Sequence, residues 1–256
     1  IKDLKNLISK KTKIVSLSFV SNVLGTINPI GEISEIVKKK QKDIIFVVDG
    51  AQAVPHFKVN VKDLSIDFLA FSGHKMLGPT GVGVLWGREE LLNEIEPLNY
   101  GGGMIEKVEI EETVFQKAPF KFEAGTPPIA SVIGLKEAIF YLEKIGMEKI
   151  QEHESELTNF ALEKIKKEFG KKIKIYGPKK RAGVIAFNFK NYHPHDISQI
   201  LASEKVCIRA GHHCAMPLHK RLNTVATCRA SFYLYNQKED IEKLIFGLKK
   251  VEKILG

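Results

Sequence analysis

Short apolar runs alternate with amphipathic stretches through the first third of the chain. Three runs rich in Ile, Val and Phe have the length of buried strands, at residues 14–19, 44–48 and 66–71. Helical patterns lie beside them at residues 2–10, 29–40 and 60–65, and the second of these begins at Asn28-Pro29. Strands that alternate with helices predict a parallel sheet with helices as its connections.

A fourth strand pattern, at residues 82–86, follows the third apolar run after a tight loop. That loop is too short for a helical crossover, so we expect this strand to run antiparallel to its neighbour. A helical stretch at 88–95 comes next, and the pattern then breaks up between residues 97 and 128. Loops of this length inside a compact domain are usually functional or mobile.

The remaining pattern predicts a second, smaller α+β domain. Helices are expected at residues 129–145, 147–169, 195–204 and 238–254. Strands are expected at residues 172–176, 183–189, 206–209 and 227–234. We therefore predict two domains, residues 1–143 and residues 144–256.

Composition changes this picture little. The 256 residues are 44% hydrophobic and 27% charged, which is ordinary for a globular domain. The net charge of +9 comes largely from lysines on helical faces, whereas a nucleic-acid surface would show Arg and aromatic residues on one stripe. No run approaches the ~18 apolar residues of a membrane span. Three irregularly spaced cysteines predict a reducing, cytoplasmic setting.

Lys75 lies in the segment Ser72-Gly73-His74-Lys75, directly after the run 66–71. A lysine at the C-terminal end of a buried strand lies where open parallel sheets bind ligands. Desolvation there favours the neutral amine, which can attack a carbonyl and form a Schiff base. Most lysines are solvated surface groups, so the position alone is weak evidence.

Asp49 strengthens this interpretation, because it ends the apolar run 44–48. An acid and an amine at two strand ends suit pyridoxal phosphate: Lys75 would hold the aldehyde, and Asp49 would keep the pyridine nitrogen protonated. Taken alone, Asp49 reads as a helix N-cap before an Ala-rich turn. Ser72 and His74 supply donors suited to a phosphate, and Gln52 can donate a further hydrogen bond.

Cys214 is the candidate nucleophile among the three cysteines. It follows Gly211-His212-His213, and the two histidines together with Arg209 are expected to lower the pKa of its thiol. The alternative is an inert core residue, which is the prediction for the other two cysteines, Cys207 and Cys228, because they lie in apolar strand patterns.

A zinc site built from His212, His213, Cys214 and His219 is the other interpretation of this segment. Structural zinc sites use spaced pairs of ligands, and the sequence has no C-x-x-C pair. We therefore predict no metal. The glycines between residues 78 and 83 precede a strand rather than a helix, which argues against a dinucleotide-binding loop.

Taken together, these motifs resemble a known family. Ser72-Gly73-His74-Lys75 with Asp49-x-x-Gln52 is similar to the cofactor site of fold-type I pyridoxal-phosphate enzymes. The segments RAGHHCAMP (209–217) and RASFYLYN (229–236) narrow the resemblance to SufS-type, group II cysteine desulfurases, a branch that includes selenocysteine lyases. The resemblance covers essentially the whole chain. It implies an α/β fold: part of the large cofactor-binding domain with a mainly parallel sheet, plus a smaller C-terminal α+β domain.

The resemblance implies a role for each cofactor-site residue. Lys75 would form the Schiff base and later move protons, Asp49 would pair with the pyridine nitrogen, and Gln52 would bond the phenolic oxygen. Ser72 and His74 would bind the phosphate. In a homodimer, Gly125 and Thr126 would reach the phosphate of the neighbouring subunit.

The resemblance also implies the residues that handle the substrate, L-cysteine. Cys214 would attack the substrate sulfur and carry it away as a persulfide, releasing alanine. Arg229 would hold the substrate carboxylate through a bidentate pair, Arg209 would support the active-site loop, and Asn22 would lie near the substrate amino group and cofactor. The sulfur would pass to an acceptor protein of the SufE or SufU type for iron–sulfur cluster assembly.

Members of this family carry a further N-terminal region that supplies the first strands of the sheet and more of the cofactor site. The chain has no initiator Met, and it is expected to be a fragment or a truncated product whose activity alone stays open. Two alternatives remain at this point. One is a selenocysteine lyase or a related lyase or aminotransferase, and the other is a truncated, non-catalytic binding paralogue.

Overall fold

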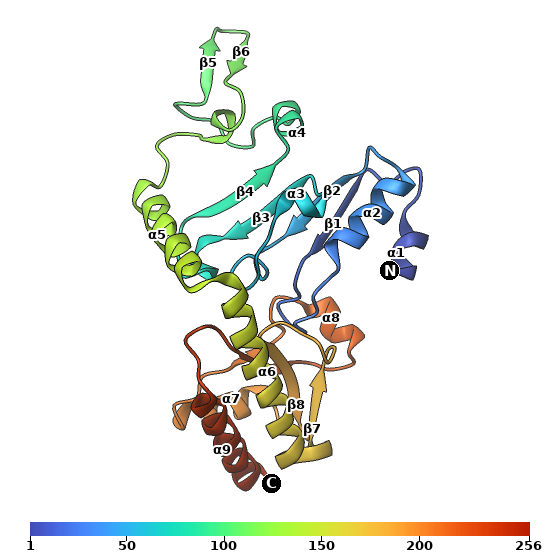
Figure 1. Cartoon of the computed structure of the whole chain (residues 1–256), viewed down its shortest axis with the longest axis vertical. Coiled ribbons are helices and arrows are strands. Elements are labelled where there is room, and N and C mark those ends of the chain that lie inside the picture. Colours follow the sequence, from blue (N-terminus) through green and yellow to red (C-terminus); the bar gives the residue numbers. More distant parts are fainter. The chain divides into compact units, whose positions relative to one another are not determined.

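The computed structural model describes residue 1 and residues 3–256, which form two compact units. The N-terminal unit comprises residues 1–19 and 29–144, and the C-terminal unit comprises residues 20–28 and 145–256 (Figure 1). The domain boundary predicted at residue 143 stays a prediction. No helix among the described residues is long and apolar enough to cross a membrane.

A four-stranded sheet forms the centre of the N-terminal unit. Its strands, in spatial order, are β1 (Ile14–Ser18), β2 (Ile45–Asp49), β3 (Phe68–Ser72) and β4 (Gly83–Gly87). The first three are parallel, and β4 is antiparallel to β3. Both the predicted parallel sheet and the predicted reversal at the fourth strand are confirmed.

The helices of this unit pack on the sheet through periodic apolar side chains. In α2 (Ile30–Lys40), Ile30, Ile33 and Val37 are buried in one cluster with Phe46 and Val48 of β2. This helical spacing places the three side chains on one face. Burial of such a side chain contributes about 1.5–3 kcal/mol. The other short helices of this unit are α1 (Lys2–Leu7), α3 (Val61–Leu64) and α4 (Glu89–Glu94).

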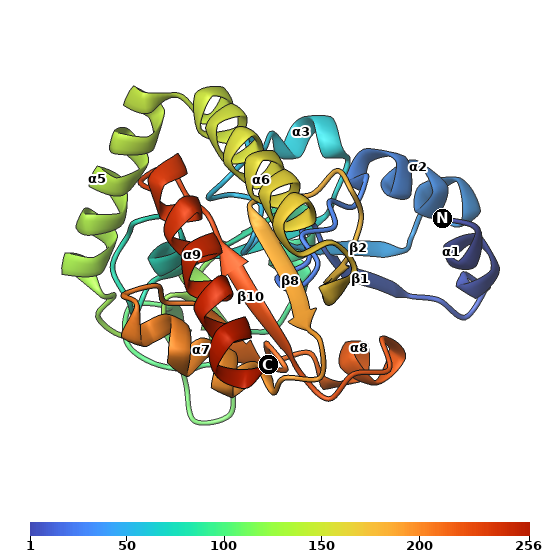
Figure 2. The same ribbon diagram turned by 90° about the horizontal axis from the view of Figure 1, so that it is seen from below.

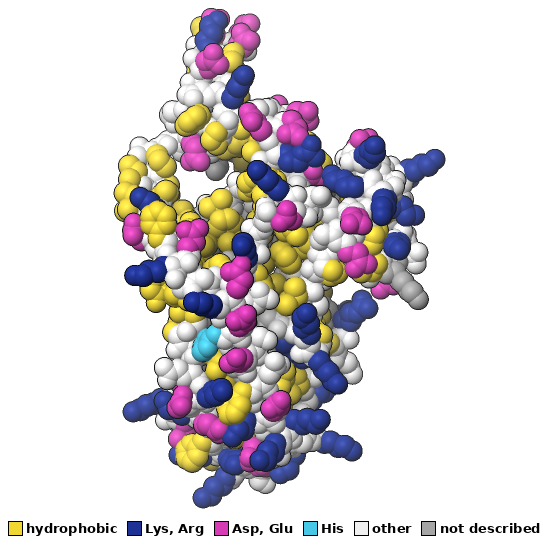
Figure 3. Space-filling model, viewed as in Figure 1, with side chains coloured by type: hydrophobic (Ala, Val, Ile, Leu, Met, Phe, Trp, Pro, Cys, Tyr) yellow, Lys and Arg dark blue, Asp and Glu magenta, His cyan; other side chains and the backbone are white. Residues whose placement is uncertain are grey.

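The segment predicted as a long loop between residues 97 and 128 contains a hairpin, β5 (Ile105–Val108) with β6 (Thr113–Phe115), and a 3-10 turn at Phe120–Phe122. Strands this short carry little periodic signal. The long helix α5 (Ile129–Ile145) follows. Hydrophobic side chains are exposed along α5 (Figure 3), including Val132, Ile133 and Phe140.

The C-terminal unit is built on an antiparallel sheet in the order β7 (Ile173–Tyr176), β8 (Val184–Phe189), β10 (Thr227–Ser231) and β9 (Arg209–Gly211). The long helices α6 (Met147–Phe169) and α9 (Lys238–Leu255) lie across one face (Figure 2), and α7 (Pro194–Ser203) joins their apolar cluster. This matches the α+β pattern predicted for the second half.

Segment 20–28 belongs to this unit because it covers the opposite face of β8. Val23 is fully buried and packs with Tyr176 and Ala186. Gly25 has φ +67° and approaches the sheet so closely that a Cβ atom would lie 2.9 Å from Val184 Cγ2. A larger residue would therefore force the segment away from the strand.

Two details of the C-terminal unit correct the sequence prediction. The strand expected at 206–209 is β9, which begins only at Arg209, and Cys207 is exposed rather than buried. The apolar run around Cys207 has the pattern of a strand, but in the structure it lies just before β9. A short helix, α8 (Met216–Arg221), was not predicted. Cys228 is buried in β10 as expected, and burial raises the pKa of its thiol to about 12.

Candidate functional site

The predicted site residues fall into two groups, one in each unit. In the N-terminal unit, Asp49 is the last residue of β2 and pairs in register with Ser18 of β1 and Ala70 of β3. The carboxyl ends of parallel strands meet at one edge of a sheet, where α/β proteins bind ligands. Asp49 is exposed at this edge.

One oxygen of the Asp49 carboxylate forms a hydrogen bond within the turn that follows β2. Oδ1 accepts a hydrogen bond from the Ala51 N–H at 2.9 Å, so Asp49 caps a turn and not the helix considered from the sequence. The residues that follow form a turn rather than a regular helix. Among the described residues, Oδ2 makes no hydrogen bond and is available to a ligand. Gln52 lies half-buried in the same turn.

Lys75 ends a 3-10 turn, Gly73–Lys75, directly after β3. The Gly73 N–H donates to the Val82 carbonyl at 3.0 Å, and the Gly73 carbonyl accepts from Met76 and Gly78. A Cβ atom on Gly73 would lie 2.8 Å from Val82 Cγ1, so only glycine allows this close approach. The backbone of the turn is thus fixed, while the side chains of His74 and Lys75 are exposed.

The remaining predicted residues of this unit lie elsewhere along the chain. Gly125 has φ +79°, and its N–H donates to the Gly102 carbonyl at 2.8 Å. Thr126, the next residue, is exposed just before α5. Their predicted contact with a neighbouring subunit stays a prediction.

In the C-terminal unit, Asn22 links two predicted site segments. Its side-chain Nδ2 donates to the His213 carbonyl at 2.8 Å, and its own carbonyl accepts from Arg229 NH1 at 2.8 Å. Asn22 itself lies in a loop closed by the Ser21–Thr26 hydrogen bond and the Val20–Ile27 bridge. One asparagine thus connects the Cys214 turn to β10.

Arg229 and Arg209 lie opposite each other on β10 and β9. Burial lowers the pKa of the Arg229 guanidinium, and the nearby charge of Arg209 lowers it further. The Nε atom of Arg229 is buried and has no hydrogen-bond partner among the described residues. Two neighbouring arginines with an unused buried donor are well suited to bind a carboxylate.

Cys214 is exposed on a strained turn. His213 and Cys214 have φ values of +52° and +59°, and Gly211 before them has φ +124°. Non-glycine residues in the left-handed region cost of order 1 kcal/mol each and concentrate at functional sites. The turn is closed by a hydrogen bond from the Ala215 N–H to the His212 carbonyl at 2.9 Å.

From the sequence, the two histidines are expected to lower the pKa of the Cys214 thiol. The structure shows that His213 does not contribute as a cation. The side chain is only 5% exposed. Desolvation by burial, with smaller contributions from Arg229 and His219, lowers the pKa of His213 to about 4. The ring is therefore neutral at neutral pH, and the positive charges in this group come from Arg229 and Arg209.

The low pKa of His213 predicts a pH-dependent stability. In the unfolded chain this histidine takes up a proton below about 6.5, whereas the folded state resists protonation until about 4. The free energy of unfolding should therefore fall by roughly 2 kcal/mol between about pH 6.5 and 4.5. Denaturant unfolding at several pH values should show a flatter dependence for His213→Gln, while exposed His195→Gln should behave as the parent. An equal slope in all three proteins would contradict the buried neutral ring.

Thr227 and His219 complete this group, and the sequence pattern predicts no role for Thr227. Thr227 Oγ1 lies 2.9 Å from His213 Nε2 and 3.1 Å from His219 Nε2, and all three side chains are buried. Among the described residues, no set of three His, Cys, Asp or Glu side chains is arranged to hold a metal ion. The two histidine rings contact the threonine hydroxyl instead.

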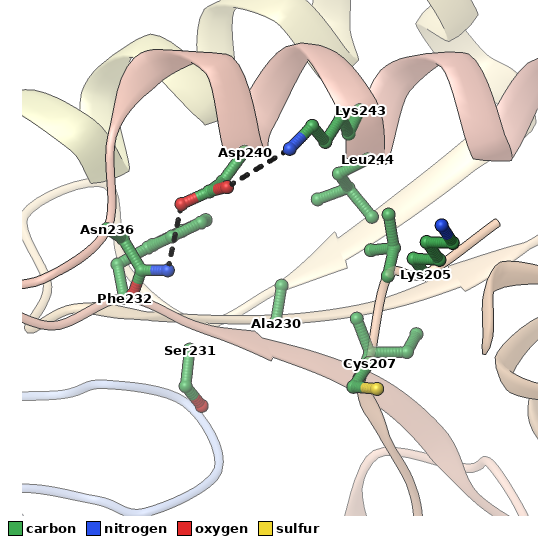
Figure 4. A pocket seen from close by; sticks show the side chains of 11 residues that line it. Lys205, Cys207, Ala230, Ser231, Phe232, Asn236, Asp240, Lys243 and Leu244 are labelled. Atoms are coloured by element: carbon green, nitrogen blue, oxygen red, sulfur yellow. Dashed lines mark hydrogen bonds and ion pairs between the residues drawn. The ribbon is translucent and has the colours of Figure 1, made fainter.

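A separate pocket of about 190 Å³ lies between β10, the first turns of α9 and the segment before β9 (Figure 4). Lys205 and Cys207 are among the residues that line it. Asp240, another lining residue, accepts a hydrogen bond from Asn236 and forms an ion pair with Lys243. None of the predicted site residues lines it.

Comparison with known proteins identifies the family of the chain by sequence. The aminotransferase class-V family matches residues 1–244. The chain is 50% identical over 256 residues to a "Probable cysteine desulfurase" of Halalkalibacterium halodurans, and 52% identical over 258 residues to one of Staphylococcus aureus. Each alignment covers 100% of this chain and 62% of the relative.

Solved structures agree. The apo cysteine desulfurase of Thermococcus onnurineus superimposes with a TM-score of 0.93 at 42% identity, over 98% of this chain and 62% of that protein. The cysteine desulfurase CsdA of Escherichia coli gives 0.94 at 34% identity, over 99% and 62%. The chain thus has part of the α/β fold of these enzymes, as predicted, and spans less than two thirds of their length. It belongs to the class-V aminotransferase family.

Proposed function

We propose that the protein is a pyridoxal-phosphate-dependent cysteine desulfurase that converts L-cysteine to L-alanine and holds the sulfur on Cys214. The observation that carries this proposal is the C-terminal group: an exposed thiol on a strained turn, joined through Asn22 to Arg229, whose Nε is buried and unpaired. A thiol and a carboxylate-binding arginine held together suit an amino acid that carries sulfur.

The residues of the N-terminal unit fit the cofactor. An acid ends β2 and an amine follows the adjacent parallel strand β3, and Asp49 keeps one carboxylate oxygen available. Asp49 would hold the pyridine nitrogen, Gln52 the phenolic oxygen, Lys75 the aldehyde carbon, and Ser72 and His74 the phosphate. When bound, pyridoxal phosphate would supply an electron sink for cleavage of the substrate carbon–sulfur bond.

The C-terminal residues orient the substrate and accept its sulfur. Arg229, with Arg209 beside it, binds the substrate carboxylate and so fixes the direction of the side chain. The Cys214 thiolate forms a bond to the substrate sulfur while the carbon–sulfur bond breaks. The sulfur remains on Cys214 as a persulfide, and the three-carbon product takes up a proton, delivered by Lys75, to become alanine. The electron pair of the broken carbon–sulfur bond stays on the carbon and takes up this proton. L-Cysteine and the Cys214 thiol together therefore give L-alanine and the Cys214 persulfide with no external oxidant.

The proposal extends to partners. The exposure of Cys214 supports transfer of the persulfide sulfur to an acceptor protein of the SufE or SufU type for iron–sulfur cluster assembly. The exposure of Thr126 supports a homodimer in which Gly125 and Thr126 reach the neighbouring phosphate site. A cytoplasmic, reducing setting is consistent with three free thiols.

The test is to supply L-cysteine to the protein loaded with pyridoxal phosphate and to measure alanine. Alkylation and mass spectrometry of the intact protein should then locate one additional sulfur atom on Cys214. Selenocysteine in place of cysteine separates a desulfurase from a selenocysteine lyase: faster turnover of selenocysteine without an acceptor would favour the lyase. A folded, cofactor-loaded protein that forms no alanine from either substrate would refute the enzyme proposal.

A further inference from the structure

The turn that carries Cys214 cannot hold its conformation by itself. Two consecutive non-glycine residues, His213 and Cys214, occupy the left-handed region, which is unfavourable for both. The surrounding structure must therefore supply the restraint. Among the described residues, two hydrogen bonds tie His213 to distant parts of the chain: Asn22 donates to its carbonyl, and Thr227 contacts its ring.

Hydrogen-bond chemistry fixes the direction of each bond in the ring cluster. The Ala215 carbonyl can only accept, so the His219 Nδ1 that lies 3.0 Å from it carries a proton. His219 is 1% exposed, and its ring nitrogens contact a carbonyl and a hydroxyl. In a neutral imidazole only one of the two nitrogens carries a proton. Its Nε2 is therefore an acceptor, and the Thr227 hydroxyl donates to it.

The single proton of the Thr227 hydroxyl is then used, so Thr227 Oγ1 must accept from His213. This places the His213 proton on Nε2 and leaves Nδ1 as an acceptor. The buried Nδ1 has no hydrogen-bond partner among the described residues. The series runs in one direction, from His213 through Thr227 and His219 to the Ala215 carbonyl.

Thr227 also lies where it can control the turn. It pairs in register with Gly211, the last residue of β9 before the turn, and it lies two residues before Arg229. Side chains at i and i+2 of a strand point to one face, so Thr227 and Arg229 belong to the same face of β10. Residues of that face reach His213 by two routes. Thr227 contacts the His213 ring, and Arg229 donates to the Asn22 carbonyl while the Asn22 side chain donates to the His213 carbonyl.

We propose that Thr227 is a positioning residue for Cys214: with His219 it locks the tautomer and orientation of His213, and this lock holds the strained turn that presents the thiol. The inference rests on the proposed sulfur-carrying role of Cys214. The hydroxyl of Thr227 is the essential feature, because it donates to His219 and accepts from His213 at once.

The test compares Thr227→Val, which keeps the shape and removes the hydroxyl, with Thr227→Ser, which keeps the hydroxyl. In the cofactor-loaded protein, Thr227→Val should lower kcat for L-cysteine by at least about tenfold, because small misplacement of a reacting group costs this much or more. KM should change by less than about twofold, because uniform substrate binding through Arg229 is retained. Thr227→Ser should restore kcat to within about threefold of the parent.

Two further readouts do not depend on turnover. Iodoacetamide should alkylate Cys214, relative to the exposed Cys207 of the same molecule, at a rate that changes at least about fivefold in Thr227→Val and stays unchanged in Thr227→Ser. Nitrogen-15 spectra of the histidine rings should show His213 as the Nε2–H tautomer only while the hydroxyl is present. A parent protein that makes no alanine would refute the proposed function. The alkylation ratio and the His213 tautomer would still test whether Thr227 positions the Cys214 turn.

His219→Phe provides a second variant in case Thr227→Val does not fold. Without the His219 acceptor, Thr227 is free to donate to His213 Nε2, and the His213 proton should move to Nδ1. We expect the Cys214 alkylation ratio to change as in Thr227→Val. Unchanged kcat and alkylation ratio in the folded Thr227→Val, or equal losses in the Val and Ser variants, would overturn the proposal, since packing rather than the hydroxyl would then matter.

Discussion

Replacing Cys214 with alanine is expected to abolish alanine formation from L-cysteine, with a loss of at least about 100-fold in kcat, a barrier increase of about 3 kcal/mol or more. The reason is chemical: the proposed reaction needs a thiolate to take the sulfur, and neither water nor an alanine methyl group can replace it. Sulfide release after addition of a reductant should fall in parallel. Both products can be followed from the same reaction mixture.

The Cys214→Ala protein should nevertheless keep the yellow colour of the bound cofactor. The residues proposed to hold the cofactor, Asp49 and Lys75, are fixed by backbone contacts within the N-terminal unit, whereas Cys214 belongs to the C-terminal unit. Loss of turnover with retained absorbance would thus separate the sulfur-transfer step from cofactor binding.

Cys207→Ala is the matched control, because Cys207 is also an exposed thiol of the C-terminal unit. Its removal should leave kcat within about twofold of the parent, as expected for a surface substitution away from the site. If Cys214→Ala kept full turnover of cysteine, the persulfide mechanism would be wrong. If Cys207→Ala lost turnover as well, the role of sulfur acceptor could not be assigned to Cys214 alone.

The parts of the fold that could be predicted are those with a strong local signal. The helices at 129–145 and 147–169 have the predicted bounds because both are long, and the second also places its buried residues at helical spacing. The reversal at β4 was predictable from loop length alone, since a parallel neighbour needs a long crossover. Asp49 could be placed at a strand end because it directly follows the apolar run 44–48, and Lys75 because it lies in the short segment that follows the run 66–71.

The parts that could not be predicted depend on contacts between distant residues. Asn22 and His213 are separated by 191 positions, and nothing local indicates their hydrogen bond. The neutral state of His213 follows from its burial, which the polar segment around it did not suggest. Thr227 was missed because a threonine in a strand is ordinary, and its role appears only once two histidines are seen to share its hydroxyl.

Asp67 is a further residue that the sequence pattern concealed, because it lies inside the apolar run 66–71. Its side chain is 2% exposed and makes three contacts: Lys38 Nζ at 2.6 Å, Arg88 NH1 at 3.1 Å and the Phe46 N–H at 2.7 Å. Its backbone N–H also donates to the Phe46 carbonyl, and its carbonyl accepts from the Arg88 N–H. One carboxylate therefore ties α2, β2 and the end of β4 to the start of β3.

Asp67→Ala should lower the free energy of unfolding of the N-terminal unit by about 3 kcal/mol. The buried Phe46 N–H loses its acceptor, at a cost of about 1–3 kcal/mol. Lys38 and Arg88 lose their shared partner, but their side chains are 27% and 48% exposed, so water compensates part of the lost attraction. The measurement is chemical denaturation of the whole chain, followed by the fluorescence of Trp86, which packs against the core of this unit.

Two variants decide whether the carboxylate acts through its charge or its shape. Asp67→Asn can keep an oxygen at the Oδ2 position, which serves both Phe46 and Lys38, but it places an amide group toward Arg88. Its loss should therefore be smaller, about 1–2 kcal/mol. Asp63→Ala removes an exposed aspartate whose carboxylate accepts from the Asn60 side chain, and it should change stability by less than about 0.5 kcal/mol. Equal stability of Asp67→Ala and Asp63→Ala would mean that the buried carboxylate contributes nothing beyond the cost of its own desolvation.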